Sequence, residues 1–357
     1  MQNTLSLVMI VKNEASKIRR CLDSVCSLVD EIIIVDTGST DNTRSIAEEY
    51  KAQIYDFEWI NDFSAARNFA LSQATGNWSL VLDADEYISN DCRAAISDFI
   101  HGDPAIGLIK RVDAFSGNEG IDYEHTYISR LFPSFCRYEG KIHEQILSDL
   151  PRRAIDMSIF HDGYLNEIKS ERNIPILLNV IAEYPGDPYY HYQIAKEYRG
   201  LDQQQECFEH LNLAYEFMQG NENYASSLIV NFLYAMIASG NLAKGVAVIE
   251  KQSERMQHYP DFYFASALYL LELILSDPDS YGNNLPLIEK FYLKALEIGE
   301  SEQEGSVRGT GSFAAHHNMG VFYEVVGDIK QAQYHYERAA EYKYAPSIKR
   351  LEDILRK

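Results

Sequence analysis

The hydrophobic pattern of this chain changes its period near residue 165. Up to that point, short β-branched runs such as LSLVMIV and EIIIV alternate with stretches whose apolar residues recur at helical spacing. Strand–helix–strand units of this length predict a parallel sheet with helices on both faces and with ligands at the carboxyl ends of the strands. We therefore expect residues 1–165 to form an α/β domain with a mostly parallel sheet.

The second part of the chain, residues 166–357, lacks strand patterns and is rich in Tyr, Ala and Leu. It is also weakly self-similar: Ala195 is followed twelve residues later by Cys207, and Gly320 is followed at the same interval by Ala332. Small residues at these offsets let two antiparallel helices pack closely. The pattern resembles the tetratricopeptide repeat, whose period is about 34 residues. We expect an all-α repeat domain, with a generic helical domain as the alternative.

The charge and the cysteine content narrow the class of protein. A net charge of −21 argues against nucleic-acid polymers and anionic membrane surfaces as partners, because both require basic faces. The five cysteines show no CxxC or zinc-type spacing, which is typical of reduced thiols in the cytoplasm. The apolar run near the N-terminus is about seven residues long, too short for a signal peptide or a membrane span. We expect a soluble cytoplasmic protein without a membrane span.

Three acids follow directly on a strand pattern in the segment NWSLVLDADE. Carboxylates packed this closely repel one another, so the end of this strand requires a positive partner. Asp83 and Asp85 point to the same side if the extended geometry continues, and their hard oxygen donors suit Mg²⁺ or Mn²⁺. The segment therefore predicts a divalent metal site, with helix capping or an ordinary loop as the alternative.

Polar residues also follow the other strands at the same predicted edge of the sheet. Val11, Asn13 and Glu14 end the first strand, where polar groups can contact a base or a ribose. Asp36 ends the second strand and is placed to accept from a ribose hydroxyl or a base N–H, or else to cap the next helix. Arg67, near the start of a helix, is placed to clamp an anionic group or to form a salt bridge within the domain. Taken together, these motifs predict a nucleotide site.

Four segments, taken in chain order, resemble the family 2 glycosyltransferases with the GT-A fold. They are MIVKNEASKIRRCLDSV, DEIIIVDTGSTDNT, DFSAARNFAL and WSLVLDADEYI. The resemblance covers residues 4–165 and is strongest in the first 90. With its helical repeats, the chain is also similar to a bacterial subgroup that includes the peptide S-glycosyltransferases of the glycocin type.

The resemblance implies a role for each residue that matches a motif of the family. Val11, Asn13 and Glu14 would border the base and ribose of a nucleotide sugar. Asp36 would bind a uracil-type base, and Arg67 would contact the diphosphate or the acids beside it. The resemblance therefore implies a UDP-sugar as the donor.

It also implies the metal site and the course of the reaction. Asp83 and Asp85 would be the metal-binding pair, with Asp83 also next to the donor and Asp85 the direct ligand of Mg²⁺ or Mn²⁺. Many GT-A enzymes add a late histidine, here His161, although a structural histidine is the alternative. The family is inverting and forms no covalent intermediate, so the acceptor must lose its proton to a base.

The base is the residue on which this chain departs from its family. Many relatives place it in a Glu-Asp pair at a helix start, and no such pair stands in the expected region. The segment YEGKIHEQ offers Glu144 as the candidate base, and His143 either positions the acceptor or is itself the base. Glu139 is a weaker candidate. The alternative is that these are ordinary polar residues on a half-exposed segment.

We expect an inverting, metal-dependent hexosyltransferase that moves a sugar from a UDP-sugar to an acceptor. A peptide or protein side chain, a saccharide and a lipid-linked glycan are all open as acceptors, and so are O- and S-linkage. A second hypothesis is a non-catalytic repeat protein that binds peptides beside a degenerate GT-A domain. A third is a nucleotidyltransferase, but the first strand end lacks the glycine-rich phosphate loop of that class. A homodimer formed through the helical repeats is also open.

Overall fold

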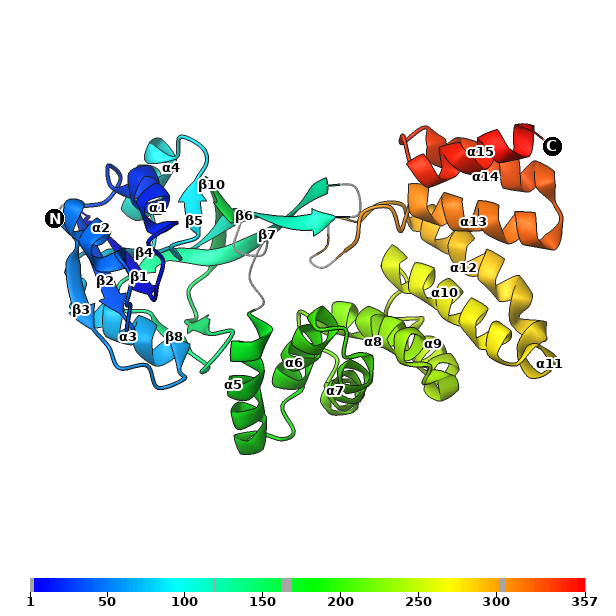
Figure 1. The fold of residues 1–357 in the computed structure, drawn as a ribbon, viewed down its shortest axis with the longest axis horizontal. Coiled ribbons are helices and arrows are strands. Elements are labelled where there is room, and N and C mark those ends of the chain that lie inside the picture. The colour runs from blue at the N-terminus through cyan, green and yellow to red at the C-terminus, as the bar shows by residue number, and fades with distance from the viewer. Residues whose placement is uncertain (1–2, 118–119, 162–168, 302, 304–305, 357) are drawn as a thin grey trace. The chain divides into compact units, whose positions relative to one another are not determined.

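The structure is a computed structural model that describes residues 3–117, 120–161, 169–301, 303 and 306–356 (Figure 1). The chain divides into two compact units, Met1–Asn179 and Val180–Lys357. The predicted boundary between residues 165 and 166 falls within 162–168, which lies outside the described residues. Within the described part of the chain, no helix is both long enough and apolar enough to cross a membrane.

The first unit is built on an eight-stranded sheet with the strand order β3-β2-β1-β4-β7-β6-β10-β5. Its strands are β1 (Leu5–Val11), β2 (Glu31–Asp36), β3 (Gln53–Asp56), β4 (Trp78–Val81), β5 (Glu86–Ile88), β6 (Ile106–Gly117), β7 (Gly120–Pro133) and β10 (Arg152–His161). β1 pairs in parallel with β2 and β4, and β2 pairs in parallel with β3. The predicted mostly parallel sheet is confirmed.

Helices cover both faces of this sheet, as the alternation of side chains along β1 requires. Leu7 and Met9 pack into one core, which also holds buried residues of α1, α2 and α4. Val8 points to the other face, where its core includes Ala70 and Leu71 of α3. The helices of this unit are α1 (Ile18–Val25), α2 (Thr43–Glu49), α3 (Phe63–Gln73) and α4 (Arg93–His101).

The half of the sheet beyond β4 is antiparallel in part. β6 and β7 form a long hairpin, β7 pairs antiparallel with β4, and β10 runs parallel to β6. The sequence pattern predicts β4 and a strand before His161 but not this hairpin, whose strands mix polar and apolar residues. A separate two-stranded sheet joins β8 (Arg137–Glu139) to β9 (Gln145–Leu147).

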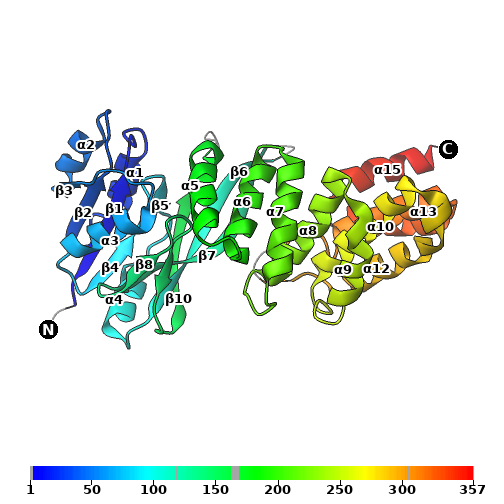
Figure 2. The same cartoon turned by 90° about the horizontal axis from the view of Figure 1, so that it is seen from below.

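The second unit consists of helices laid side by side in chain order (Figures 1 and 2). From the helix that crosses the boundary onward, these are α5 (Ser170–Glu183), α6 (Pro188–Gly200), α7 (Gln204–Phe217), α8 (Ala225–Ser239), α9 (Gly245–Gln252), α10 (Pro260–Ser276), α11 (Pro278–Tyr281), α12 (Leu285–Ile298), α13 (Phe313–Val326), α14 (Ile329–Ala340) and α15 (Ala345–Leu355). Short 3₁₀ turns lie at Leu242–Lys244 and Gly282–Asn284.

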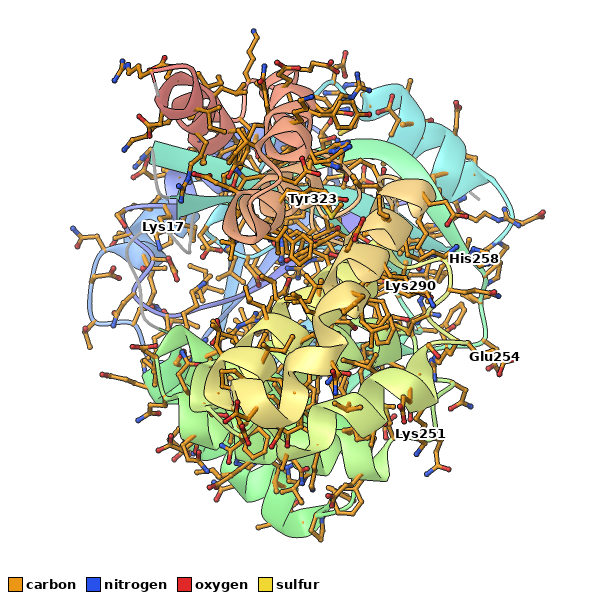
Figure 3. All side chains as sticks on the ribbon, turned by 90° about the vertical axis from the view of Figure 1, so that its right-hand side faces the viewer. Lys17, Lys251, Glu254, His258, Lys290 and Tyr323 are labelled. Carbon is orange, nitrogen blue, oxygen red and sulfur yellow. The ribbon has the colours of Figure 1, made fainter. Side chains whose placement is uncertain are left out.

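Small residues allow these helices to touch, as their spacing predicts. A Cβ atom on Gly320 would lie 2.5 Å from Cε1 of Tyr336, so α13 and α14 approach too closely for a larger side chain. Ala332 on α14 and Ala195 on α6 are likewise buried. Charged side chains such as Lys251 and Glu254, both labelled in Figure 3, are exposed on the outside of these helices.

Candidate active site

The ends of β1 and β2 meet at one edge of the sheet because Val11 stands opposite Asp36 in their parallel register. The two polar segments that follow are bonded together. Asn13 adopts φ 57°, its N–H donates to Oγ of Ser39 at 2.9 Å, and its Oδ1 accepts from the N–H of Thr40 at 2.7 Å. The prediction that these strand ends converge is confirmed.

Asp36 is buried, and its two carboxylate oxygens have different surroundings. Oδ1 accepts from the N–H groups of Gly38 at 2.8 Å and Ser39 at 2.7 Å, which closes the tight turn after β2. Oδ2 has no hydrogen-bond partner in the described part of the chain, although Nη1 of Arg44 lies 3.6 Å away. The next helix instead begins at Thr43, whose N–H donates to Asp41 at 3.0 Å. Asp36 therefore stabilises its own turn through Oδ1, while its buried Oδ2 faces only the guanidinium of Arg44 among the described residues.

Glu14 lies behind this turn. Its N–H donates to Oγ1 of Thr43 at 2.7 Å, and its carboxylate is 4.0 Å from Nζ of Lys17. The carbonyl of Val11 accepts from the N–H of Thr37 at 2.9 Å. Val11, Asn13 and Glu14, the residues predicted to border a base and ribose, are thus all hydrogen-bonded to the segment that follows β2.

Two arginines neutralise the first of the three clustered acids. Oδ1 of Asp83 accepts from Nη2 of Arg67 at 2.8 Å, and its Oδ2 accepts from Nη2 of Arg130 at 2.7 Å. Burial alone would raise the pKa of Asp83, but Arg130 and Arg67 outweigh that effect and hold the pKa well below its usual range. The positive partner at this acid is a pair of guanidinium groups.

Arg130 also forms an ion pair with the third acid, Glu86. Its Nη2 donates to Oε1 of Glu86 at 2.8 Å, and Oε2 of Glu86 accepts from the N–H of Asp83 at 2.9 Å. Burial raises the pKa of Glu86 above its ordinary value, and Arg130 offsets part of this rise. The sequence gives no role to Arg130, because β7 becomes a neighbour of β4 and Asp83 only in the folded sheet.

The second acid, Asp85, faces a different set of groups. Its Oδ2 lies 3.1 Å from Nζ of Lys169 and 3.4 Å from Nε2 of His161. Burial would raise the pKa of Asp85, but His161 and Lys169 lower it to about 2, so the carboxylate is ionised. On its other side, His161 places Nδ1 2.7 Å from Oδ1 of Asp113. Burial lowers the pKa of His161, but Asp113 and Asp85 outweigh it and raise the pKa to about 9.

These residues fit a divalent ion held by few protein ligands. Among the described residues, no group of three or more His, Cys, Asp and Glu side chains is arranged to hold a metal. Asp85 and His161 are nonetheless adjacent, and Asp113 contacts the imidazole on its other side, the position from which a carboxylate commonly supports a metal ligand. Mg²⁺ and Mn²⁺ commonly take one or two protein ligands and complete their shell with phosphate and water.

Glu144 and Arg67 form a buried ion pair, with Nε of Arg67 donating to Oε1 of Glu144 at 2.5 Å. This pair connects Glu144 to Asp83 through one guanidinium, so the candidate base lies beside the acid cluster. Nη1 of Arg67 is buried and has no hydrogen-bond partner among the residues that the structure describes. His143 adopts φ 53°, while Glu139 is exposed on β8. Arg67 therefore forms the salt bridge within the domain, the alternative role predicted for it from the sequence. Its Nη1 group takes no part in that salt bridge.

A Rossmann-like, mostly parallel sheet with this acidic edge defines a GT-A domain. Residues 6–160 match the family described as glycosyl transferase family 2, so the first half of the chain carries a domain of that family. The resemblance seen in the four sequence segments is confirmed.

Individual relatives match parts of the chain. The glycosyltransferase SunS, derived from prophage SPbeta in Bacillus subtilis, is 27% identical over 76% of this chain and 68% of its own length. A TPR repeat-containing protein of Synechococcus elongatus is 56% identical over 40% of this chain, a match that spans only 35% of that relative.

Solved structures also match parts of the chain. Glucosyl-3-phosphoglycerate synthase from Mycobacterium tuberculosis, in complex with Mg²⁺ and uridine diphosphate, is 23% identical over 31% of this chain and 44% of its own, with a TM-score of 0.26. MamA is 16% identical over 50% of this chain and 96% of its own, with a TM-score of 0.38.

Proposed function

We propose that this protein transfers a sugar, with inversion, from a UDP-sugar to an acceptor in a reaction that depends on Mg²⁺ or Mn²⁺. The observation that carries the proposal is the line Asp85–His161–Asp113. An imidazole is held there between a supporting carboxylate at 2.7 Å and a second carboxylate at 3.4 Å. Asp85 lies between β4 and β5, Asp113 lies within β6 and His161 ends β10, directly after the residues that match family 2 glycosyltransferases. This line supports a metal-binding role for Asp85 and His161.

The donor nucleotide is assigned to the ends of β1 and β2. Oδ2 of Asp36 is a buried acceptor without a partner, which matches the N3–H donor of a uracil ring. Val11, Asn13 and Glu14 form the adjoining segment and would border the base and the ribose. The spare N–H of Arg67 would face the diphosphate or its neighbouring acids.

The metal would lie at Asp85 and His161, where a divalent ion stabilises the diphosphate as it leaves. Both oxygens of Asp83 accept from arginines, so Asp83 would act beside the ion, through Arg67 and Arg130. In this arrangement Asp83 and Glu86 share Arg130, and the ion would neutralise Asp85.

Glu144 is our candidate for the base that takes the proton of the acceptor. Its pairing with Arg67 supports this role only through position, because it places the carboxylate next to the acid cluster. Glu144→Gln should abolish transfer and leave donor binding nearly intact. Full turnover in this variant would assign the base to His143 or Glu139 instead.

We assign the acceptor to the helical unit and favour a peptide or protein side chain. Grooves of helical repeats commonly bind extended peptides, and the net charge of −21 suits a basic peptide better than an anionic glycan. Initial rates with a basic peptide library and with oligosaccharides would separate the two acceptor classes.

A thermal-shift panel of nucleoside diphosphates and nucleotide sugars, with and without Mn²⁺, tests the donor and the metal together. We expect stabilisation by uridine nucleotides only when the metal is present, and its loss in His161→Ala. Equal stabilisation by every nucleotide, or an unchanged response in His161→Ala, would contradict the proposal. Hydrolysis of UDP-sugar that disappears in Asp85→Asn would exclude the non-catalytic alternative.

A further inference from the structure

Lys169 forms an ion pair with Asp85 and is more exposed than Arg67 and Arg130, the arginines that pair with Asp83. Arg67 and Arg130 are buried, with 8% and 10% of their side chains exposed, and each donates to two carboxylates. The Lys169 side chain is 28% exposed, and its Nζ lies 3.1 Å from Oδ2 of Asp85. An ammonium on a flexible stem is a hydrated point charge that leaves a partner more readily than a guanidinium fork does.

The backbone at Lys169 is fixed although its side chain is long and flexible. Its carbonyl accepts from the N–H groups of Arg172 at 3.2 Å and Asn173 at 3.0 Å at the start of α5. The guanidinium of Arg172 in turn lies 5.0 Å from the centre of the Phe63 ring, which ties this helix start to α3. Rotation of the side chain would move the ammonium group and leave the hydrogen bonds at the start of α5 unchanged, because these use the backbone carbonyl of Lys169.

The contact lies on the same oxygen that faces His161. Oδ2 of Asp85 is 3.1 Å from the ammonium and 3.4 Å from Nε2 of the imidazole. A divalent ion held by Asp85 and His161 would thus approach the ammonium at short range, and two positive charges so close repel strongly. A diphosphate offers the ammonium a new anionic partner at the moment the ion arrives.

We propose that Lys169 competes with the divalent cation for Asp85 and transfers its ammonium group to a phosphate of the donor when the ion binds. This inference rests on the proposed function, because it takes Asp85 and His161 as the metal ligands. Metal and nucleotide then bind cooperatively. The ion displaces the ammonium of Lys169 from Asp85 towards the phosphate, and the phosphate attracts the ammonium away from the metal site. Lys169 is a positioning residue in this scheme and adds no step to the chemistry.

The test is direct binding of Mn²⁺ to the full chain, followed by the electron paramagnetic resonance signal of the free ion. Without nucleotide, Lys169→Met should bind Mn²⁺ about tenfold more tightly than the natural protein, because one like charge is removed near the surface. Added UDP should raise the Mn²⁺ affinity of this variant less than that of the natural protein. Lys169→Arg, which keeps the charge, should not gain affinity.

Lys294→Met is the matched control, because Lys294 pairs with Glu297 on α12 and its loss changes the net charge by the same amount. This control should bind Mn²⁺ as the natural protein does. If Lys169→Met binds Mn²⁺ no more tightly than the natural protein while Asp85→Asn loses binding, the role of Lys169 is wrong and the proposed metal site stands. If neither the natural protein nor Lys169→Met binds Mn²⁺ with UDP present, both the inference and the metal dependence are wrong.

Discussion

Asp113 and His161 stand opposite each other in the parallel register of β6 and β10, and Oδ1 of Asp113 lies 2.7 Å from Nδ1 of His161. Arg111 holds the carboxylate from behind, with its Nε 2.9 Å from the same oxygen. Nε2 of the imidazole consequently faces Asp85. Two strands far apart in the sequence thus fix the direction in which a histidine presents its nitrogen.

Asp113→Asn removes the charge that orients His161. We expect the affinity for Mn²⁺ to fall by about ten- to a hundredfold, as is typical when the support of a metal ligand is lost. Calorimetric titration with Mn²⁺ in the presence of UDP measures the change. Asp98→Asn on the exposed side of α4 is the control and should titrate like the natural protein. Equal affinities in both variants would contradict the supporting role of Asp113.

Asp36→Asn tests the assignment of the base. Asparagine keeps an Oδ1 that can accept from Gly38 and Ser39, but it replaces the partnerless Oδ2 with an N–H donor. A uracil N3–H would then meet a donor, and UDP binding should weaken by about 1–3 kcal/mol. Affinity for inorganic diphosphate with Mn²⁺ should be unchanged. Equal losses for UDP and diphosphate would show that the turn, rather than the base contact, was damaged.

Arg130→Met leaves Asp83 with one partner and Glu86 without its closest one. We expect the free energy of unfolding to drop by about 3 kcal/mol, because a buried charge loses its counterion and Asp83 remains partly exposed. Urea denaturation measures this loss. The double variant Arg130→Met/Glu86→Gln removes one of the stranded charges and should recover part of the stability. A double variant less stable than the single one would refute this account.

Two histidine pairs in the helical unit predict a pH dependence of stability. Nδ1 of His191 lies 2.9 Å from Nδ1 of His210, and Nδ1 of His316 lies 2.9 Å from Nδ1 of His335. In each pair the residue numbers differ by 19. Burial, followed by the neighbouring histidine, lowers the pKa of His210 and of His335 to about 4. The unfolded chain therefore binds protons near pH 6.5, where these folded side chains do not.

Because the unfolded state binds more protons, stability should fall as the pH drops from about 6.5 to about 4. We expect each of the two histidines to contribute about 1 kcal/mol per pH unit over the middle of that window, less than the full linkage slope since they are only partly shielded. Urea midpoints at several pH values measure the slope. The variant His210→Gln/His335→Gln should flatten it, and an unchanged slope would assign the effect to other groups.

Much of the fold follows from local pattern. The apolar runs before Asn13, Asp36 and Asp83 are long enough and β-branched enough to define parallel strands, so the sequence places these polar groups at one edge. The close packing of the repeat helices is also predictable from sequence, because two helices in close contact leave no room for a side chain larger than that of Gly320.

The partners of those residues were decided by tertiary structure. Arg130, Asp113 and Lys169 carry no motif. Arg130 and Lys169 contact the acid cluster from positions remote in the chain, and Asp113 is connected to it through His161. The sequence by itself determined where the carboxylates of NWSLVLDADE lie, because hydrophobic periodicity is a local property of a segment. Only the folded sheet decided which cation neutralises each of them, because electrostatic pairing depends on distance in space rather than on separation along the chain.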